Sequence, residues 1–367
     1  MARDQKLKPE IYPLTGIRAA AAIWVVLFHM QTQLAESYPR LNFLIAPIVA
    51  HGYLGVDLFF ILSGFIIHYN YVTRLTEFSM SAICEFLWMR LARLWPVHAV
   101  ILILFALLLW VQRLHGMSPA QPELYTASGF LRNLFLVHSW AIPLKISWNV
   151  PAWSISCEWL AYLLFPFLVV SRLCTASARQ SAIVATLALA CTALVCQKLH
   201  AAGNANFGVV RIAGEFIAGC ALCHIFRADI TNRFPWQYIV PLAILSVFIG
   251  PYFVLPAFGL VAFWCIPLLG VIVLGLAHHR CFISRLCSTK LLLFGGYISY
   301  SLYMVHELCL ILLKRADARL GGMLAPFVDL LAVVTAAVLF FYFVEEPCRK
   351  AMRNVFPRHK QQPYPVI

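Results

Sequence analysis

Long apolar runs separated by short polar segments form the dominant pattern along this chain. A helix that crosses a bilayer needs about 20 mostly apolar residues. Ten stretches meet that requirement, the seventh and eighth being parted only by a break around Pro251 and Pro256. The pattern therefore predicts an all-α polytopic membrane protein, with one transmembrane domain over residues 1–367. The expected spans are about 12–34, 54–72, 94–112, 152–171, 181–199, 206–225, 237–255, 257–277, 291–313 and 325–345.

The composition agrees with a membrane protein. Hydrophobic residues make up 62% of the chain and charged residues 12%, against roughly 45–50% and about 25% in ordinary globular domains. So little charge cannot cover a water-exposed surface, which excludes a soluble enzyme, a disordered scaffold and a disulfide-stapled secreted domain. The 12 cysteines show no framework spacing, and Cys220 and Cys223 form an isolated C-x-x-C inside an apolar run. We interpret this pair as packing residues and expect no metal site.

The basic residues are unevenly distributed between the two sides of the membrane. The net charge is +13, from 28 Lys+Arg against 15 Asp+Glu. An even number of spans puts both termini on one side, and that side carries 18 Lys and Arg against 8 in the opposite loops. Because cytoplasmic loops are the basic ones, both termini are predicted to be cytoplasmic. The same rule accounts for much of the positive charge without a nucleic-acid partner.

The longest loop, about residues 113–151, is expected on the outer face. Its part from 123 to 137 has the pattern of an interfacial helix, with Leu131, Leu134 and Phe135 on one side. A long ordered loop beside a membrane pocket often forms a lid or an acceptor site. A plain connector fits the pattern equally well, and the sequence leaves both interpretations open.

Four ionisable side chains fall at a similar depth in the expected membrane. With a helical rise of about 1.5 Å per residue, His29 and His306 lie about 22 Å above the inner ends of their spans. Asp57 and Glu158 enter from the outer side and reach about 9 Å in depth. Intramembrane ionisable groups usually face the interior of the bundle and often carry function. If they converge, imidazole beside carboxylate suits general-base work on a hydroxyl.

Each of these residues also has a plain structural interpretation. His29 alone suits a hydrogen bond between helices, and Asp57 suits the N-cap of a span. His306, with Tyr300 and Tyr303 on the same stretch, suits interface packing. Their common depth favours the functional interpretation of the set.

The arginines within and beside the spans need partners. Arg211 has Glu215 four residues on, which suits an intrahelical pair. Arg18, near the inner end of the first span, is placed to attract a cytosolic anion. Arg90 and Arg93 on the following inner segment are three residues apart and so lie on neighbouring parts of a helix surface, and guanidinium binds phosphate bidentately. Ordinary positive-inside charge is the alternative for the last two.

Six short motifs occur in order along nearly the whole chain, and together they resemble the acyltransferase-3 family of integral membrane acyltransferases. Each is a weak match alone, but all six in order among ten spans are specific. Thr15 stands where many relatives have Asp, and Trp159 where a second Glu is common. The motifs are Leu14-Thr15-Gly16-Ile17-Arg18 with His29, residues 55–65, Arg90 with Arg93, Trp153-Ser154-Ile155-Ser156-Cys157-Glu158 with Tyr162, residues 298–303 leading to His306, and Glu345-Glu346-Pro347.

The resemblance implies transfer of an acyl group, usually acetyl from acetyl-CoA, to a hydroxyl of a glycan or related acceptor. It implies a multi-pass protein of the cell (inner, cytoplasmic) membrane whose partners are the lipid bilayer, acyl-CoA and the acceptor. The acceptor itself, the choice between acetyl and succinyl or other acyl groups, and the oligomeric state stay open.

The resemblance also suggests roles for individual residues. The CoA phosphates are expected at Arg90 and Arg93, with Arg18 nearby, and Ser63 is expected to line the acyl channel. His29 is expected to act as general base or to receive the acyl group transiently, with Glu158 orienting it and Arg18 completing the catalytic set. The acceptor is expected near Asp57, Tyr300, Tyr303 and His306.

Two other classes of function fit parts of the pattern. A transporter or flippase of an acyl or glycan carrier suits ten spans with buried charges, but the chain has no visible inverted repeat or matched broken helices. A non-catalytic receptor or assembly factor predicts that His29 and Glu158 can be replaced without loss. Consumption of a CoA thioester separates an enzyme from both.

Overall fold

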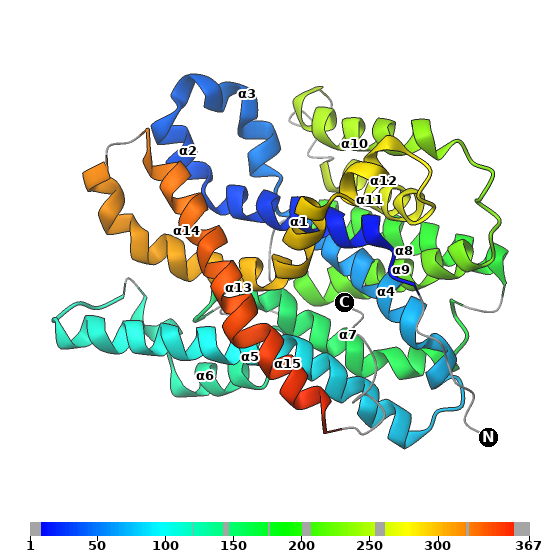
Figure 1. Cartoon of the computed structure of the whole chain (residues 1–367), viewed down its shortest axis with the longest axis horizontal. Coiled ribbons are helices and arrows are strands. Elements are labelled where there is room, and N and C mark those ends of the chain that lie inside the picture. Colours follow the sequence, from blue (N-terminus) through cyan, green and yellow to red (C-terminus); the bar gives the residue numbers. More distant parts are fainter. Residues whose placement is uncertain are drawn as a thin grey trace.

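The computed structural model describes residues 9–119, 121–141, 147–174, 177–199, 207–253, 261–320 and 323–355, which form helices and no strand (Figure 1). A helix occupies each of the ten expected spans. The basic terminal segments and the junction between the seventh and eighth spans lie outside the described residues. The ten helices are α1 (Tyr12–His29), α4 (Leu54–Leu75), α5 (Met80–Leu114), α7 (Trp153–Val170), α8 (Ala178–Lys198), α9 (Gly208–Arg227), α10 (Trp236–Phe253), α11 (Val261–Ala277), α13 (Lys290–Leu320) and α14 (Ala325–Phe340).

Eight of the described helical segments are long and apolar enough to cross a membrane, while α10 and α11 are shorter apolar helices. Large apolar side chains cover the outside of the bundle, as in Phe343 of the C-terminal segment (75% exposed), Leu242 of α10 (64%) and Phe167 of α7 (60%). An exposed apolar surface of this kind is suited to lipid. The protein is thus an all-α, polytopic membrane protein, as the hydrophobic pattern predicted.

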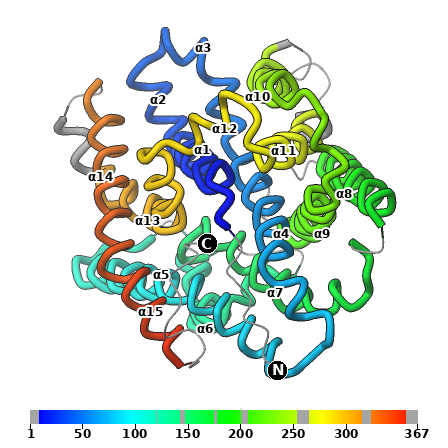
Figure 2. The backbone as a smooth tube through the Cα atoms, turned by 45° about the vertical axis from the view of Figure 1, so that its right-hand side comes forward, coloured from blue at the N-terminus to red at the C-terminus, as the bar shows by residue number. Residues whose placement is uncertain are grey.

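Helix α1 lies near the middle of the bundle, with α13 and α4 packed against it (Figure 2). Its contact with α13 is a close one, because a Cβ on Gly296 would lie 2.0 Å from the Thr15 carbonyl oxygen. Helices α4 and α9 approach equally closely, since a Cβ on Gly219 would lie 2.1 Å from the Ile61 carbonyl oxygen. Small residues allow such approach between membrane helices. As the first and ninth spans, α1 and α13 run in the same direction, so side chains of their outer halves meet.

Helix α1 ends earlier than the expected span 12–34. Met30 leaves the helical conformation with φ −91° and ψ 3°, and two further helices follow, α2 (Gln31–Ser37) and α3 (Pro39–Ala50). Gln33 Nε2 of α2 donates a hydrogen bond of 2.7 Å to Asp329 Oδ2 of α14. An apolar pattern does not record a change of axis, so the hydropathy of this region could not show the break.

The last span is followed by a change of helix type. Helix α14 continues through a π-helical turn, η4 (Phe341–Glu345), into α15 (Glu346–Arg353), and the three form one rod along the face of Figure 1. A π-helical turn is rare and frequently occurs at functional sites. Here it carries Glu345, whose carboxylate enters the bundle.

The long outer loop packs back against the bundle. It contains η1 (Pro122–Leu124), α6 (Ala127–Leu134) and η2 (Val150–Ala152), so its helix is shorter than the expected 123–137. His98 Nε2 lies 2.7 Å from the Asn133 carbonyl oxygen, and Trp95 Nε1 donates to the Leu134 carbonyl oxygen at 3.0 Å. These α5 residues lie about 24 Å or more from the outer end of α5.

The inner loop before α13 carries the short helix α12 (Phe282–Cys287).

Candidate active site

An open cavity of about 770 Å³, including the solvent space at its mouth, lies between α1, α4, α5, α7 and α13. Along α4 its wall runs from Val56 to Ile67, about 17 Å at the rise of an α-helix. It therefore extends over about half of a bilayer core of about 30 Å. Of the residues expected in the site, seven line it: Arg18, Ser63, Arg90, Arg93, Glu158, Tyr300 and Tyr303.

Three guanidinium groups face this cavity near its inner end. Arg90 Nη2 donates to the Tyr71 hydroxyl at 2.9 Å, and its guanidinium carbon lies 5.0 Å from the Tyr71 ring centroid. Arg93 forms an ion pair with Glu345, and its guanidinium carbon lies 5.2 Å from the Tyr300 ring centroid. The three arginines outnumber the carboxylates Glu158 and Glu345, so this end of the cavity has an excess of positive charge and suits an anion.

Glu345 reaches Arg93 because of the π-helical turn that carries it. Its second oxygen, Oε2, accepts a hydrogen bond of 2.7 Å from Ser301 Oγ of α13, and its side chain is 1% exposed. The carboxylate therefore joins α5, α13 and the C-terminal rod. In the sequence Glu345 stands out only as part of a motif, because an ion pair between residues 252 positions apart leaves no local signal.

The middle of the cavity holds a hydrogen-bonded group on α4 and α7. Ser63 Oγ donates to Glu158 Oε1 at 2.8 Å and lies 3.0 Å from the Tyr162 hydroxyl, which also donates to Glu158. Glu158 and Tyr162 are four residues apart and so lie on one face of α7. Further out, Ser154 Oγ and the Tyr303 hydroxyl are 2.7 Å apart. The hydrogen bonds of Glu158 thus go to Ser63 and Tyr162, while the expected partner, His29, lies elsewhere.

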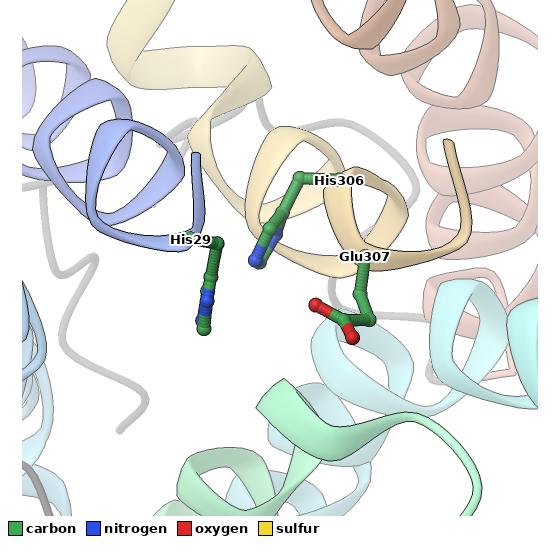
Figure 3. A group of neighbouring side chains, drawn as sticks. All are labelled: His29, His306 and Glu307. Atoms are coloured by element: carbon green, nitrogen blue, oxygen red, sulfur yellow. The ribbon is translucent and has the colours of Figure 1, made fainter. Parts of the chain in front are cut away.

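His29 and His306 are stacked on each other (Figure 3), and neither is among the residues that line the cavity. Their ring centroids are 4.8 Å apart with an interplanar angle of 25°. The ring of Tyr303, which lines the cavity, lies 5.7 Å from that of His306. The two histidines were expected at one depth from their positions in parallel spans, and the close packing of α1 on α13 brings them together. The imidazole of His306 therefore lies beside a side chain of the cavity wall.

Glu307 is the carboxylate beside this pair. Its oxygens and the ring nitrogens of His29 and His306 include three potential ligand atoms within 4.8 Å of one another, and Figure 3 shows the carboxylate on the side of the histidines. Glu307 was not among the residues that the sequence predicted in the site. The available signal was its position next to His306 in the same span.

Asp57 lies in a buried ion pair away from the cavity wall. Arg211 of α9 donates to Asp57 Oδ1 from Nε at 2.9 Å and from Nη2 at 2.8 Å, and both side chains are 1% exposed. The Arg211 guanidinium carbon lies 5.1 Å from the Trp153 ring centroid. The ion pair of Arg211 is thus with another helix, whereas the four-residue spacing had suggested Glu215. A desolvated guanidinium requires such a partner.

The C-x-x-C pair packs as the sequence indicated. Cys220 and Cys223 are fully buried in α9, and the Cys220 thiol donates to the Gly64 carbonyl oxygen at 3.3 Å. Both belong to the α4–α9 contact.

Comparison with known proteins identifies the type of chain. The model of an acyltransferase domain family matches residues 11–346. The chain is 25% identical to the acyltransferase MdmB of Streptomyces mycarofaciens, an alignment that covers 92% of each protein. No solved structure matches this chain.

Two longer relatives carry names that specify the group transferred. The putative peptidoglycan O-acetyltransferase YrhL of Bacillus subtilis (strain 168) is 24% identical over 94% of this chain and 56% of its own length. The O-acetyltransferase OatA of Staphylococcus aureus (strain MRSA252) is 24% identical over 98% of this chain and 61% of its own length. The chain therefore spans less than two thirds of these two relatives.

Proposed function

This chain belongs to the family of membrane acyltransferases whose model spans residues 11–346, and from that membership we propose that it is an O-acyltransferase. Its donor would be cytosolic acyl-CoA, most simply acetyl-CoA, and its acceptor a hydroxyl of a glycan or related molecule of the cell envelope. The reaction would take place within the inner (cytoplasmic) membrane and deliver the acyl group near its outer face.

One observation carries this proposal: a single cavity connects a cluster of arginines to the neighbourhood of two histidines. The inner end, with Arg18, Arg90 and Arg93, has the charge to hold the phosphates of CoA, because guanidinium groups bind phosphate by charge-assisted hydrogen bonds. The outer end stops at Tyr303, next to His306. A slender thioester arm that extends about 17 Å along α4 would bring its acyl carbon toward the histidines.

His29 is the base in this mechanism. It takes the proton of the acceptor hydroxyl while the oxygen forms a bond to the thioester carbonyl carbon. The tetrahedral intermediate then expels the CoA thiolate, which receives the proton, so that ester and free CoA thiol leave with no net proton change. Glu307 is close enough to offset the transient positive charge on the imidazole. A carboxylate beside a catalytic histidine stabilises the imidazolium in the same way in serine hydrolases.

Glu158 acts as a positioning residue rather than as the partner of His29. Its carboxylate accepts hydrogen bonds from Ser63 and Tyr162 and so fixes the polar side of the cavity wall where the acyl arm passes. Tyr300 and Tyr303 form the opposite wall on α13. Asp57 is held in an ion pair with Arg211. Of the residues expected near the acceptor, Tyr303 and His306 therefore have the better support.

The direct test is acyl transfer by the purified protein in lipid nanodiscs. Release of CoA thiol from acetyl-CoA is followed in the presence of cell-envelope glycan fractions, and mass spectrometry detects an added acetyl group. His29→Ala is expected to lose transfer by at least about 100-fold, the usual scale for removal of a general base. His115→Ala, a change of an exposed histidine at the end of α5, is the matched control and is expected to retain it.

Two results would contradict the proposal. Transport of an acyl or glycan carrier with no consumption of a CoA thioester would favour the transporter. Transfer at the wild-type rate by a well-folded His29→Ala protein would remove the base from the mechanism. Surface glycans from cells with and without the protein, compared by mass, identify the acceptor class independently.

A further inference from the structure

His29, His306 and Glu307 bring two imidazole nitrogens and a carboxylate oxygen to one place, and we propose that they form a reversible binding site for Zn²⁺ or a similar divalent transition metal. The three potential ligand atoms lie within 4.8 Å of one another. Two histidines and one glutamate are a common ligand set of zinc sites that keep one position open for water or substrate. The sequence predicted no metal here, because the ligands come from helices far apart in the chain.

His306 already has the orientation of a metal ligand. Its Nδ1 lies 2.6 Å from the Tyr303 carbonyl oxygen, so Nδ1 carries the proton and Nε2 carries the lone pair. Nε2 is buried and has no hydrogen-bond partner within the described part of the chain. Metal-bound histidines usually donate their other ring N–H to a carboxylate or a backbone carbonyl, which fixes tautomer and ring orientation. A cation would supply the partner that Nε2 lacks.

The other two ligands can move onto a cation held by His306. Zinc bonds to nitrogen and oxygen are about 2.0–2.2 Å long in a tetrahedron, so neighbouring donors of a loaded site lie about 3.3–3.6 Å apart. His29 is the last residue of α1, and both His29 and Glu307 are only partly buried. Small changes of their side-chain torsions close the remaining distance, while their exposure leaves a way in for the ion.

Metal binding would also switch off the proposed reaction, a consequence that rests on the proposed function. A cation on His29 occupies the lone pair that would take the acceptor proton. The metal-bound protein would therefore be inactive, and removal of the ion by a chelator would restore transfer.

Binding is tested with Co²⁺ as the probe on the purified full-length protein in nanodiscs. Tetrahedral Co²⁺ with nitrogen and oxygen ligands shows visible d–d bands without thiolate-to-cobalt charge transfer, which distinguishes this site from the free cysteines, of which Cys84 and Cys191 are exposed. We expect one equivalent of such Co²⁺, displaced by Zn²⁺. His306→Ala is expected to abolish the signal, and Glu307→Gln to weaken binding at least about tenfold.

Matched controls are Glu36→Gln and His115→Ala, which change an exposed carboxylate and an exposed histidine elsewhere; both should bind Co²⁺ as the wild type does. Glu307→Gln keeps the side-chain shape, so it remains informative if His306→Ala does not fold. Absence of the thiolate-free bands in the wild type, or their persistence at wild-type strength in Glu307→Gln, would overturn the site. The binding signal does not depend on acyl transfer, so a failure of the proposed activity would leave it unchanged.

Discussion

Three arginines line the same cavity, but they differ in the groups that already bind them. Arg93 is paired with the buried Glu345, Arg90 donates to a neutral tyrosine hydroxyl, and Arg18 faces the cavity from α1. A guanidinium held by a buried carboxylate has less freedom to bind a phosphate, and its removal leaves the carboxylate unpaired. We therefore expect Arg90 and Arg18 to bind the ligand, and Arg93 to have a partly structural role.

Replacement of Arg90 and of Arg93 should have different consequences. Loss of a charge-assisted hydrogen bond to phosphate costs about 1.5–3 kcal/mol, so Arg90→Ala is expected to raise KM for acetyl-CoA by about 10- to 100-fold. Loss of one partner of a buried ion pair costs about 3–5 kcal/mol, so Arg93→Ala is expected to lower the Tm of the protein. Steady-state kinetics and thermal unfolding of the two variants make the comparison. An unchanged Tm in Arg93→Ala, or an unchanged KM in Arg90→Ala, would contradict the assignment.

His138, in the outer loop between α6 and η2, is expected to give that loop a pH dependence. Its ring stacks on that of His98 at 6.1 Å. Burial, and secondarily repulsion from His98, lowers the pKa of His138 from 6.5 to about 3. Below pH 6.5 an open loop takes up a proton that the packed loop rejects, so the packed loop loses up to about 1.4 kcal/mol per pH unit between pH 6.5 and about 3. Above pH 7 the effect is absent.

Hydrogen exchange of residues 129–139 measures this effect. After correction for intrinsic rates, protection is expected to be lower at pH 5 than at pH 7.5. His138→Gln removes one of the two stacked imidazoles and should show a smaller difference in protection between the two pH values than the wild type. A wild-type loop with equal protection at both would show that His138 does not control its packing.

At the scale of elements, α4 and α9 form one of the closest helix–helix contacts of the bundle. Their backbones approach at Gly219, and the Asp57–Arg211 ion pair crosses the same contact. The ion pair lies one residue along α4 from Val56, which lines the cavity. Asp57 thus influences the site by fixing the helix that carries Ser63, without itself facing the cavity.

Single and double variants of the pair test this structural role. Arg211→Met leaves Asp57 charged and unpaired and is expected to destabilise the protein by about 3–5 kcal/mol. Asp57→Leu combined with Arg211→Met removes both partners of the ion pair and leaves the buried Glu215 beside them. It is expected to recover part of that loss, since a buried pair and an apolar pair of similar volume are often comparable in stability. Thermal unfolding in detergent measures both. A double variant that is stable but transfers no acyl group would contradict a purely structural role of the ion pair.

For the whole molecule, the orientation in the membrane decides which end of the cavity receives acyl-CoA. The arginines lie toward the inner ends of α1 and α5, and the histidines toward the outer ends of α1 and α13, when the termini are cytoplasmic. The uneven count of Lys and Arg between the two sides supports that orientation. With the opposite orientation, the arginines would face the compartment that lacks acyl-CoA.

Reporter fusions test the orientation directly. Green fluorescent protein fused after Ile367 is expected to fluoresce. Alkaline phosphatase inserted after Gly116, where a Cβ would meet nothing within 4 Å, is expected to be active, and the same insertion after Leu173 inactive. The reverse pattern of phosphatase activity would invert the protein and place the cavity's positive end outside.

The sequence by itself determined the helical membrane class and the presence of a helix in each of ten apolar stretches. It also predicted that His29 and His306 share a depth, and their rings lie side by side. Hydropathy and rise per residue are properties of one segment at a time, so local residues suffice to set them. Membership of the family could also be recognised from motifs that are local strings. The same locality explains why the end of α1 at Met30 and the additional helices α2 and α3 were missed, since they depend on a change of axis within one apolar pattern.

Only the tertiary structure decided which side chains meet. Arg211 pairs with Asp57 of another helix instead of Glu215, Glu345 reaches Arg93 through a π-helical turn, and Glu307 instead of Glu158 lies beside the histidines. Several carboxylates lie at a similar depth, and any of them could pair with a given cation or imidazole. The sequence does not show how each helix is rotated about its axis relative to its neighbours, so it cannot select among them. That rotation is fixed by packing at small residues such as Gly296 and Gly219, where backbones approach most closely.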